Sequence, residues 1–305
     1  MIKNEKQDSY LLSSAIYENS YSAMVPWLHS IGLQNHGLHF RENSRHYSLA
    51  EDYLINSKNV RHDLEFDHSV RKYLEDTGVT MVSLSGQEEL SHQKITLPES
   101  VPLNLALSEA MRLRRSKRHF TGDAIPLNYL ATLLRASNGI SYQSRVQLMN
   151  GGNVTLHART VSSAGALYPI DIYFAPLNVN PIAKGIYHYH PRADAVTAID
   201  DEKSIKKLLK TFSAPEEFIS ISQAAVIVVI TAKPCKTTRK YGERGLRFVL
   251  HEAGSISQNI HLAVAGLGLG SIDCASFYDD EMATALNLNS QFEIPLHSII
   301  IGVDA

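Results

Sequence analysis

The stretch 224–231 constrains the fold of this chain most strongly, because its central part, Ala225–Ile230, is apolar at every position. A strand with one buried face alternates apolar and polar residues, whereas a continuously apolar strand is buried on both faces. Such a strand needs further layers of structure on each side of its sheet. The sequence therefore predicts an α+β or α/β domain.

Helices and other strands are interleaved with this run. Residues 245–266 carry a broad apolar stripe at helical spacing. Residues 126–136 form a second clear helix, because Pro126 stands at the start and Gly139 just past the end. Weaker patterns predict helices at 48–54, 64–74 and 279–288, and strands at 170–177, 186–190 and 298–303.

The polar stretch 83–100 is predicted to be a linker between a small, mainly helical region, residues 1–94, and a larger domain, residues 95–305. The formal net charge of −2 argues against a nucleic-acid-binding protein, which normally has a strongly basic face. No apolar run is long enough to span a membrane, and the first residues lack the apolar core of a signal peptide. We therefore expect a cytoplasmic protein that binds neither nucleic acid nor membranes.

Three patterns that suggest other kinds of site are set aside. The two cysteines, Cys235 and Cys274, lack the spacing of metal ligands. His188 and His190 alternate on a predicted strand without a third convergent ligand, so we expect them to be surface or groove residues. The glycines of 266–270 end a helix, whereas a dinucleotide-binding fingerprint opens one. No metal site is predicted.

The segment 114–118 gathers three arginines, a serine and a lysine directly after an apolar helical run, residues 105–113. Guanidinium groups donate charge-assisted hydrogen bonds to a phosphate and to the polar edge of a ring. The alternative is a solvated basic helix end, which the helix dipole favours. The segment alone leaves both interpretations open.

Three further markers follow it along the chain. The loop 162–169, Ser-Ser-Ala-Gly-Ala-Leu-Tyr-Pro, precedes a predicted strand, and its small residues would let a planar ligand approach the backbone. Residues 239–247, Arg-Lys-Tyr-Gly-Glu-Arg-Gly-Leu-Arg, lead into the long helix. The glycine-rich stretch 266–271 is followed by residues 272–277. Each marker alone could be a tight loop or an ordinary helix end.

Together and in this order, the four markers resemble the nitroreductase-like flavin fold, and most of all its SagB-type branch, the azoline dehydrogenases. The resemblance covers residues 95–304 and rests on the Leu-Tyr-Pro loop and the Lys-Tyr-x-x-Arg-Gly-x-Arg run. It implies an α+β fold with a central, mainly antiparallel sheet flanked by helices. It further implies FMN as cofactor, a homodimer with the flavin at the interface, and an enzyme that aromatises thiazolines or oxazolines in a ribosomally synthesised peptide.

The resemblance also implies which residues contact the flavin. The first set matches the segment that meets the phosphate and the pyrimidine edge of the ring: Arg114, Arg115, Ser116 and Arg118. The second set matches a loop that lies against the flavin, typically from the partner subunit: Ser163, Ala164 and Gly165. The third set matches the segment whose backbone amides approach N5 and O4: Ala275 and Ser276.

Lys240 and Tyr241 match the pair to which the branch assigns proton abstraction. Desolvation and the neighbouring Arg239 and Arg244 would lower the pKa of Lys240 toward neutrality. The implied partners are an azoline-containing precursor peptide and a cyclodehydratase. Two alternatives stay open: a nicotinamide-dependent nitro- or quinone reductase, and a flavin-bearing subunit that only scaffolds a peptide-modifying complex.

Overall fold

The computed structural model describes residues 49–84 and 94–305, with side chains from residue 53 onward. The chain divides into two compact units, Met1–Asp63 and Leu64–Ala305. In the first unit, the described part contains helix α3 (Leu49–Asn56), close to the helix predicted at 48–54. The division predicted between residues 94 and 95 stays a prediction about the chain's domains.

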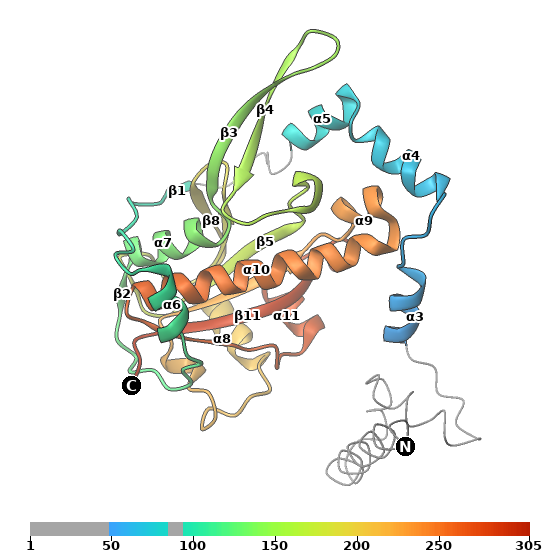
Figure 1. Cartoon of the computed structure of the whole chain (residues 1–305). Coiled ribbons are helices and arrows are strands. Elements are labelled where there is room, and N and C mark those ends of the chain that lie inside the picture. Colours follow the sequence, from blue (N-terminus) through green and yellow to red (C-terminus); the bar gives the residue numbers. More distant parts are fainter. Residues whose placement is uncertain (1–48, 85–93) are drawn as a thin grey trace, which may run out of the picture. The chain divides into compact units, whose positions relative to one another are not determined.

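A seven-stranded sheet forms the centre of the second unit, and every neighbouring pair of its strands is antiparallel. The strand order is β1-β8-β7-β5-β9-β11-β10 (Figure 1). This arrangement confirms the predicted α+β class with a central antiparallel sheet. The strands are β1 (Lys94–Thr96), β5 (Ile170–Pro176), β7 (Ile186–His190), β8 (Ala195–Asp200), β9 (Val226–Ala232), β10 (Gly270–Asp273) and β11 (Ile294–Gly302).

Strand β9 is buried on both faces because its side chains enter two different cores. The even-numbered residues from Val226 to Ile230 pack in one core, and Ile227 and Val229 pack in the other. None of these side chains is more than 1% exposed, which accounts for the continuous apolar run in the sequence. Two helices complete each core: α7 (Leu127–Asn138) and α10 (Gly245–Gly266) the first, α8 (Glu202–Lys210) and α11 (Asp279–Ala285) the second.

Several smaller elements lie around the sheet. A hairpin of β3 (Ile140–Gln147) and β4 (Asn153–Arg159) projects away from it, and the sequence patterns do not predict either strand (Figure 1). Strands β2 (Ile125–Pro126) and β6 (Val179–Asn180) form a short parallel pair. The remaining helices are α4 (Leu64–Lys72), α5 (Asp76–Ser83), α6 (Leu107–Leu113) and α9 (Cys235–Tyr241).

Two expectations from the sequence are wrong. Lys94–Thr96 lies in the stretch predicted as a linker, but it forms β1 and pairs with β8 at the sheet edge. His188 and His190 are buried, 6% and 7% exposed, and are not surface or groove residues, because both faces of β7 are covered. His190 Nε2 lies 2.8 Å from Thr197 Oγ1 on the neighbouring strand, which supplies a polar partner inside the protein.

Two further features concern the described ranges only. Within residues 49–84 and 94–305, no group of His, Cys, Asp or Glu side chains is arranged to hold a metal ion. None of the helices in these ranges combines the length and the apolar character that crossing a bilayer requires.

Candidate active site

Lys240 and Tyr241 end the short helix α9, which is separate from the long helix α10. Gly242 follows them with a φ of +56°, a conformation that glycine adopts at little cost, and the chain turns there before α10 begins. Lys240 is only 6% exposed although it carries an amine. The predicted catalytic pair is therefore largely enclosed by the protein.

The predicted flavin loop contacts this pair within the same chain. A Cβ atom placed on Gly165 would lie 2.7 Å from Lys240 Nζ and 2.8 Å from the Tyr241 hydroxyl. Gly165 also has a φ of +64°, in the left-handed region that favours glycine. The backbone conformation favours glycine here, and an added Cβ would displace the ends of the Lys240 and Tyr241 side chains. Three of the predicted site residues therefore meet at this position.

Aromatic rings surround the amine of Lys240. Its Nζ lies 5.0 Å from the ring centroid of Tyr73 and 5.2 Å from that of Tyr241. The Tyr241 ring in turn packs edge-on against Phe248, with centroids 5.1 Å apart, and lies 6.4 Å from Phe66. Tyr73 and Phe66 precede the predicted domain, and no sequence signal marks them as part of a site.

This environment shifts the pKa values of both catalytic candidates. Burial lowers the pKa of Lys240, because the enclosed charged ammonium is poorly solvated. Burial also raises the pKa of Tyr241, and the nearby Tyr73 adds to that effect. The expected contribution of Arg239 and Arg244 to Lys240 is wrong: desolvation alone lowers its pKa. Both shifts act in the direction that favours the uncharged form of each group.

A hydrogen-bonded frame holds the loop that contains Gly165. Tyr168 donates its backbone N–H to Ser163 Oγ at 2.9 Å, and its hydroxyl accepts the backbone N–H of Arg159 at 3.1 Å. The Arg159 guanidinium lies 4.4 Å above the Tyr168 ring. Ala166 and Tyr168 have φ values of +54° and +44°, a strain that persists only where the surroundings determine the conformation.

Glu252 of α10 lies beneath the same loop. It is 2% exposed and accepts a hydrogen bond from Ser163. Burial raises the pKa of Glu252 to about 7, although the hydrogen bond from Ser163 and the charge of Arg159 oppose this shift. The carboxyl group therefore carries a proton over much of the range below neutrality.

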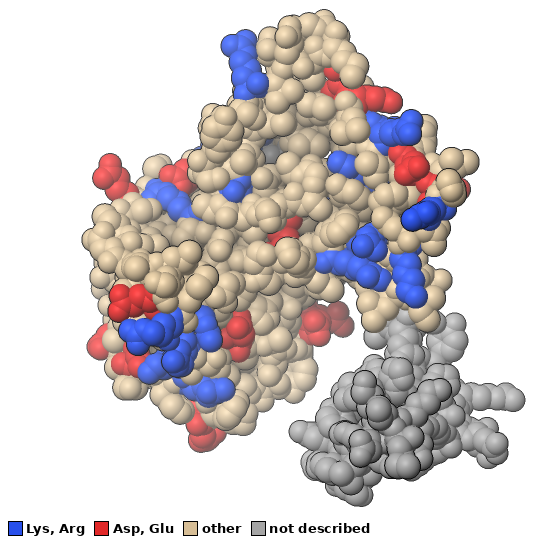
Figure 2. All heavy atoms as spheres, viewed as in Figure 1, with Lys and Arg blue, Asp and Glu red and all other residues tan. Residues whose placement is uncertain are grey.

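The basic segment 114–118 lies elsewhere, beside the edge strand β10. Ser116 pairs with Ser271 in a parallel bridge, and the backbone N–H of Lys117 donates to the carbonyl oxygen of Ser271 at 2.9 Å. Lys117 Nζ forms an ion pair with Asp304 at 2.6 Å. Figure 2 shows basic side chains gathered over α6 and the segment that follows it.

The three arginines of this segment have no carboxylate partner among the described residues. Arg115 Nη1 donates to the carbonyl oxygens of Arg112 and Arg114, at 2.6 and 2.8 Å. The Arg118 guanidinium lies 5.4 Å from the Phe218 ring centroid. A set of guanidinium groups without carboxylates fits an anion such as a phosphate.

Ala275 and Ser276 follow β10 after one residue, Cys274, so this strand brings them to the same edge of the sheet as Ser116. Both are exposed, and the Ser276 carbonyl oxygen accepts the backbone N–H of Ser213 at 2.8 Å. The guanidinium groups of segment 114–118 could hold a phosphate here, and residues 275–276 lie at the same edge of the sheet.

A polar cluster that sequence reasoning did not find supports this edge. Asp273 contacts His261 at 3.0 Å, His297 at 2.6 Å and Ser257 at 2.7 Å. Burial acts against ionisation, but these hydrogen bonds hold the pKa of Asp273 well below its usual range. His261 also lies 2.7 Å from Ser271 Oγ, so the ionised cluster fixes β10 where Ser116 pairs with it.

One chain does not bring all the predicted flavin residues together. Segment 114–118 lies near the C-terminal end of α10, because Lys117 packs beside Gly270, four residues beyond that end. The Ser163–Gly165 loop contacts Glu252 and Lys240 near the opposite end (Figure 1). At 1.5 Å per residue, Glu252 and Gly266 alone are about 21 Å apart along the helix axis.

Comparison with known proteins places this architecture in a family. The model of the nitroreductase family matches residues 111–303, more than half of the chain. "Putative nitroreductase MJ1384" of Methanocaldococcus jannaschii is 31% identical over 209 residues, which cover 68% of this chain and 96% of that protein. A solved structure from Ralstonia eutropha with the same description has a TM-score of 0.55 at 26% identity, covering 72% of this chain and 92% of its own.

A more limited similarity is to a protein that processes a peptide. The microcin B17-processing protein McbC of Escherichia coli is 28% identical over 142 residues, which cover 45% of this chain and 52% of McbC. A chain of the E. coli microcin synthetase McbBCD complex with truncated pro-MccB17 bound has a TM-score of 0.54 at 21% identity; the match covers 81% of this chain and 100% of that one. Fold, family match and relatives agree: the chain belongs to the nitroreductase family of oxidoreductases, whose members typically bind FMN.

Proposed function

We propose that this protein is an FMN-dependent dehydrogenase that oxidises thiazoline or oxazoline rings of a ribosomally synthesised peptide to thiazoles or oxazoles. The observation that carries the proposal is the buried amine of Lys240, which lies with Tyr241 against the glycine of the predicted flavin loop. The similarity to McbC supports a peptide as the substrate. An ordinary flavin reductase would have no need for a desolvated base at this position.

The chemistry requires one base and one hydride acceptor. The Cα hydrogen of an azoline lies between a carbonyl and a C=N bond, so it is acidic. Aromatisation removes it as a proton and removes a hydride from the neighbouring ring carbon, two hydrogens and two electrons in total. FMN, when bound, would supply the hydride acceptor. Lys240, in its neutral form, accepts the proton at Nζ. Tyr241 keeps its phenolic proton and serves as a hydrogen-bond donor beside the amine.

We assign the flavin to the edge formed by segment 114–118 and Ala275–Ser276. Arg114, Arg115 and Arg118 would hold the phosphate and the pyrimidine edge. The Ser163–Gly165 loop that completes the site would come from a second copy of the chain, since one chain separates it from the basic segment. The proposal therefore includes a homodimer, and light scattering that finds an FMN-loaded monomer at micromolar concentration would contradict it.

The direct test incubates the purified protein with FMN and a precursor peptide that a cyclodehydratase has already converted to azolines. We expect a yellow protein and a loss of two hydrogens, about 2 Da, from each azoline, read by mass spectrometry. Absence of flavin absorbance after incubation with FMN would refute the proposal. Rapid bleaching of the flavin by NADPH without azoline oxidation would instead favour a nitro- or quinone reductase.

The third possibility is a flavin-bearing scaffold subunit. Co-purification of the protein with the cyclodehydratase tests the proposed complex, and the mass of the peptide product tests catalysis separately. A complex that assembles fully with Lys240→Ala and still yields the oxidised product would favour a scaffold role for this chain. We expect assembly without oxidation.

A further inference from the structure

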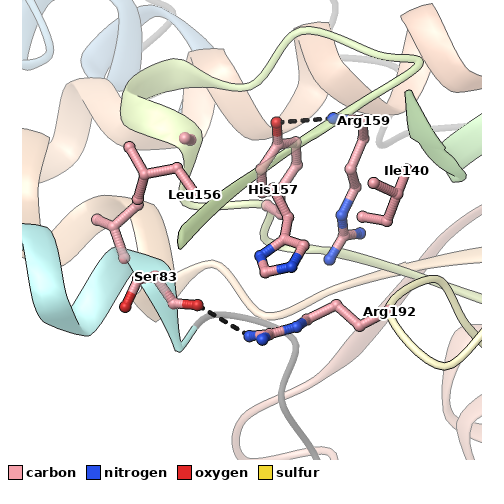
Figure 3. A pocket seen from close by; sticks show the side chains of 9 residues that line it. Ser83, Ile140, Leu156, His157, Arg159 and Arg192 are labelled. Atoms are coloured by element: carbon pink, nitrogen blue, oxygen red, sulfur yellow. Dashed lines mark hydrogen bonds between the residues drawn. The ribbon is translucent and has the colours of Figure 1, made fainter. Parts of the chain in front are cut away.

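A small hollow lies behind the loop that contacts the catalytic pair. It is enclosed by the end of α5, the base of the β3–β4 hairpin and the turn after β7, and Ala166 and Tyr168 of the loop line it. Figure 3 shows the side chains of His157, Arg159 and Arg192 directed toward one another across it. Its position connects it to catalysis, because the residue before Ala166 is the glycine in contact with Lys240 and Tyr241.

The hollow is lined by two arginines and a histidine and by no carboxylate. Arg159 is 7% exposed, and its Nη1 has no hydrogen-bond acceptor among the described residues. Among the described residues, His157 Nδ1 also lacks a hydrogen-bond partner. In the same ranges, Arg192 donates one hydrogen bond, to the Ser83 carbonyl oxygen at 2.8 Å. Proteins rarely leave the donors of a buried guanidinium without an acceptor. The arrangement calls for an anionic acceptor.

Nearby carboxylates do not supply it. Glu252 and Asp171 are the acidic groups whose charges act on Arg159, but among the described residues no ion pair joins either of them to it. Asp171 is already paired with Lys233 at 2.7 Å. Glu252 accepts a hydrogen bond from Ser163, and its Oε1 has no partner among the described residues. Neither carboxylate is bonded to Arg159, and Arg159 lines the hollow, so the hollow is where an acceptor from outside the chain can reach it.

The size of the hollow limits the ligand. The free volume is about 10 Å³, roughly the room that one water-sized body needs. A phosphate or sulfate group does not fit, whereas one oxygen of a carboxylate does. His157 and Arg192 are only half-buried, so a carboxylate can reach Arg159 from their side.

We propose that the hollow between His157, Arg159 and Arg192 binds a carboxylate, and that the substrate peptide supplies it from an acidic residue close to the azoline. The second part rests on the proposed function. A carboxylate held there would dock the peptide against the Ala166–Tyr168 side of the loop while the ring lies at Lys240 on the other side. The pocket would thus act in substrate selection and leave the chemical step to Lys240.

The first experiment is independent of the proposed function. The FMN-loaded protein is titrated with formate at constant ionic strength, with methanesulfonate as the balancing anion, and the thermal midpoint is measured. We expect a saturable rise for the wild type and for Arg192→Lys, and none for Arg192→Gln. Arg145→Gln is the matched control, since Arg145 is exposed on the same hairpin and does not line the hollow, and it should behave as the wild type.

The second experiment uses azoline peptides that differ only in one Glu or Gln, moved through the positions on either side of the ring. At the best position, the Glu peptide should have a KM lower by about 10-fold or more, the range of a charged hydrogen bond, with kcat unchanged. Arg192→Gln should abolish the preference, and Arg145→Gln should keep it.

The outcomes separate the two parts of the proposal. No formate effect in any of these proteins would overturn the carboxylate site and leave a single ordered water as its occupant. A formate effect without a Glu preference would overturn the peptide as the source and identify a free carboxylate. A formate effect in a protein that oxidises no azoline would sustain the site while the proposed function fails.

Discussion

The two ends of helix α10 carry two different kinds of functional surface. At its N-terminal half, Lys240, Tyr241 and Glu252 are enclosed beneath a strained loop, and burial shifts the pKa of each. Near its C-terminal end, the side chains of segment 114–118 are largely exposed and pair with no carboxylate among the described residues, apart from Lys117. We call the first the closed end of α10 and the second its open end.

The difference indicates a division of labour. Desolvation is useful where a proton must be moved, because it favours the neutral form of an amine. Desolvation would be harmful where a doubly charged phosphate must be bound, because it disfavours the charged form of a cation. A cation exposed to water keeps its charge before the phosphate binds. The closed end is thus suited to chemistry and the open end to anchoring. Substitutions at five positions test this contrast.

Replacing Lys240 should give the largest effect. Lys240→Ala removes the proposed base, and loss of a general base lowers the rate by roughly 10²–10⁴-fold. Lys240→Met should have the same effect while filling the space. FMN absorbance and the dimer should be unchanged in both. Azoline turnover and a flavin spectrum are measured on the same samples, with Arg239→Ala, an exposed neighbour on α9, as the control that keeps its rate.

The pH dependence of the rate sharpens this prediction. The rate should rise with pH as Lys240 loses its proton, and the rise should lie below the ordinary lysine value of 10.5 because burial lowers the pKa. Near-normal oxidation by Lys240→Met would exclude the amine as the base. Loss of flavin from that variant would show that the closed end also anchors the cofactor.

Glu252 should make the protein less stable as the pH rises. Its folded pKa of about 7 lies above the ordinary 4.5, so the folded protein binds more protons than the unfolded chain between these values, and the free energy of unfolding falls as the pH rises through that window. The fall amounts to about 3 kcal/mol at 1.36 kcal/mol per pKa unit. Glu252→Gln, which cannot ionise, should lose this contribution.

Urea unfolding at pH 5 and pH 8 measures the effect of Glu252. The control is Glu109→Gln, which removes an exposed carboxylate at the open end and should keep the pH dependence of the wild type. If Glu252→Gln also keeps it, the closed end does not hold a protonated carboxyl group.

Removing an arginine from the open end should weaken FMN binding without changing the chemistry. Arg114→Ala or Arg118→Ala should cost about 1.5–3 kcal/mol, the value of a lost charged hydrogen bond, or roughly 10–150-fold in Kd. Fluorescence titration with FMN measures the Kd, and turnover at saturating FMN should be preserved. Arg112→Ala, which removes a charge paired with Glu109 on the exposed side of α6, should bind FMN normally. Equal weakening by all three would reduce the open end to a general basic surface.

Gly165→Ala should have the smallest effect on stability, about 1–2 kcal/mol for a left-handed residue other than glycine. Gly151→Ala is the matched control, because Gly151 has a φ of +83° with open space around its Cβ position. Thermal unfolding should be affected similarly in both. Only Gly165→Ala should also slow turnover, since its Cβ displaces the Lys240 amine. Equal activity in the two variants would show that the contact is unimportant.

The central fold could be predicted from the sequence because its longest elements have complete patterns. The helix predicted at 245–266 has those bounds in the structure, and β7 begins and ends where the alternation predicts. The β3–β4 hairpin could not be found, because most residues of Ile140–Gln147 are exposed and neither face has an apolar row. The amphipathic helix Glu202–Lys210 could have been predicted from the sequence, because Asp201 caps its N-terminus.

The sequence could predict the site only where a contact is local or where a motif identifies the residues. The meeting of Gly165 with Lys240 depends on the packing of a loop against a distant helix, and so does the ring of Tyr73 beside the amine. The pairing of Ser116 with Ser271 is equally non-local. The resemblance to the nitroreductase-like fold identified most of these residues. Spacing along the chain does not reveal which of them lie at the same end of α10.

The contact between Gly165 and Lys240 determines which residues each subunit of a dimer would contribute to a site. If the flavin site forms between two copies, each copy delivers its loop and its base together, while the basic segment comes from the other. A dimer of one Arg114→Ala chain and one Lys240→Ala chain would then place both defects in one site and leave the second site complete. At an FMN concentration that leaves Arg114→Ala largely unloaded, the two variants, mixed and reassembled, should therefore complement each other.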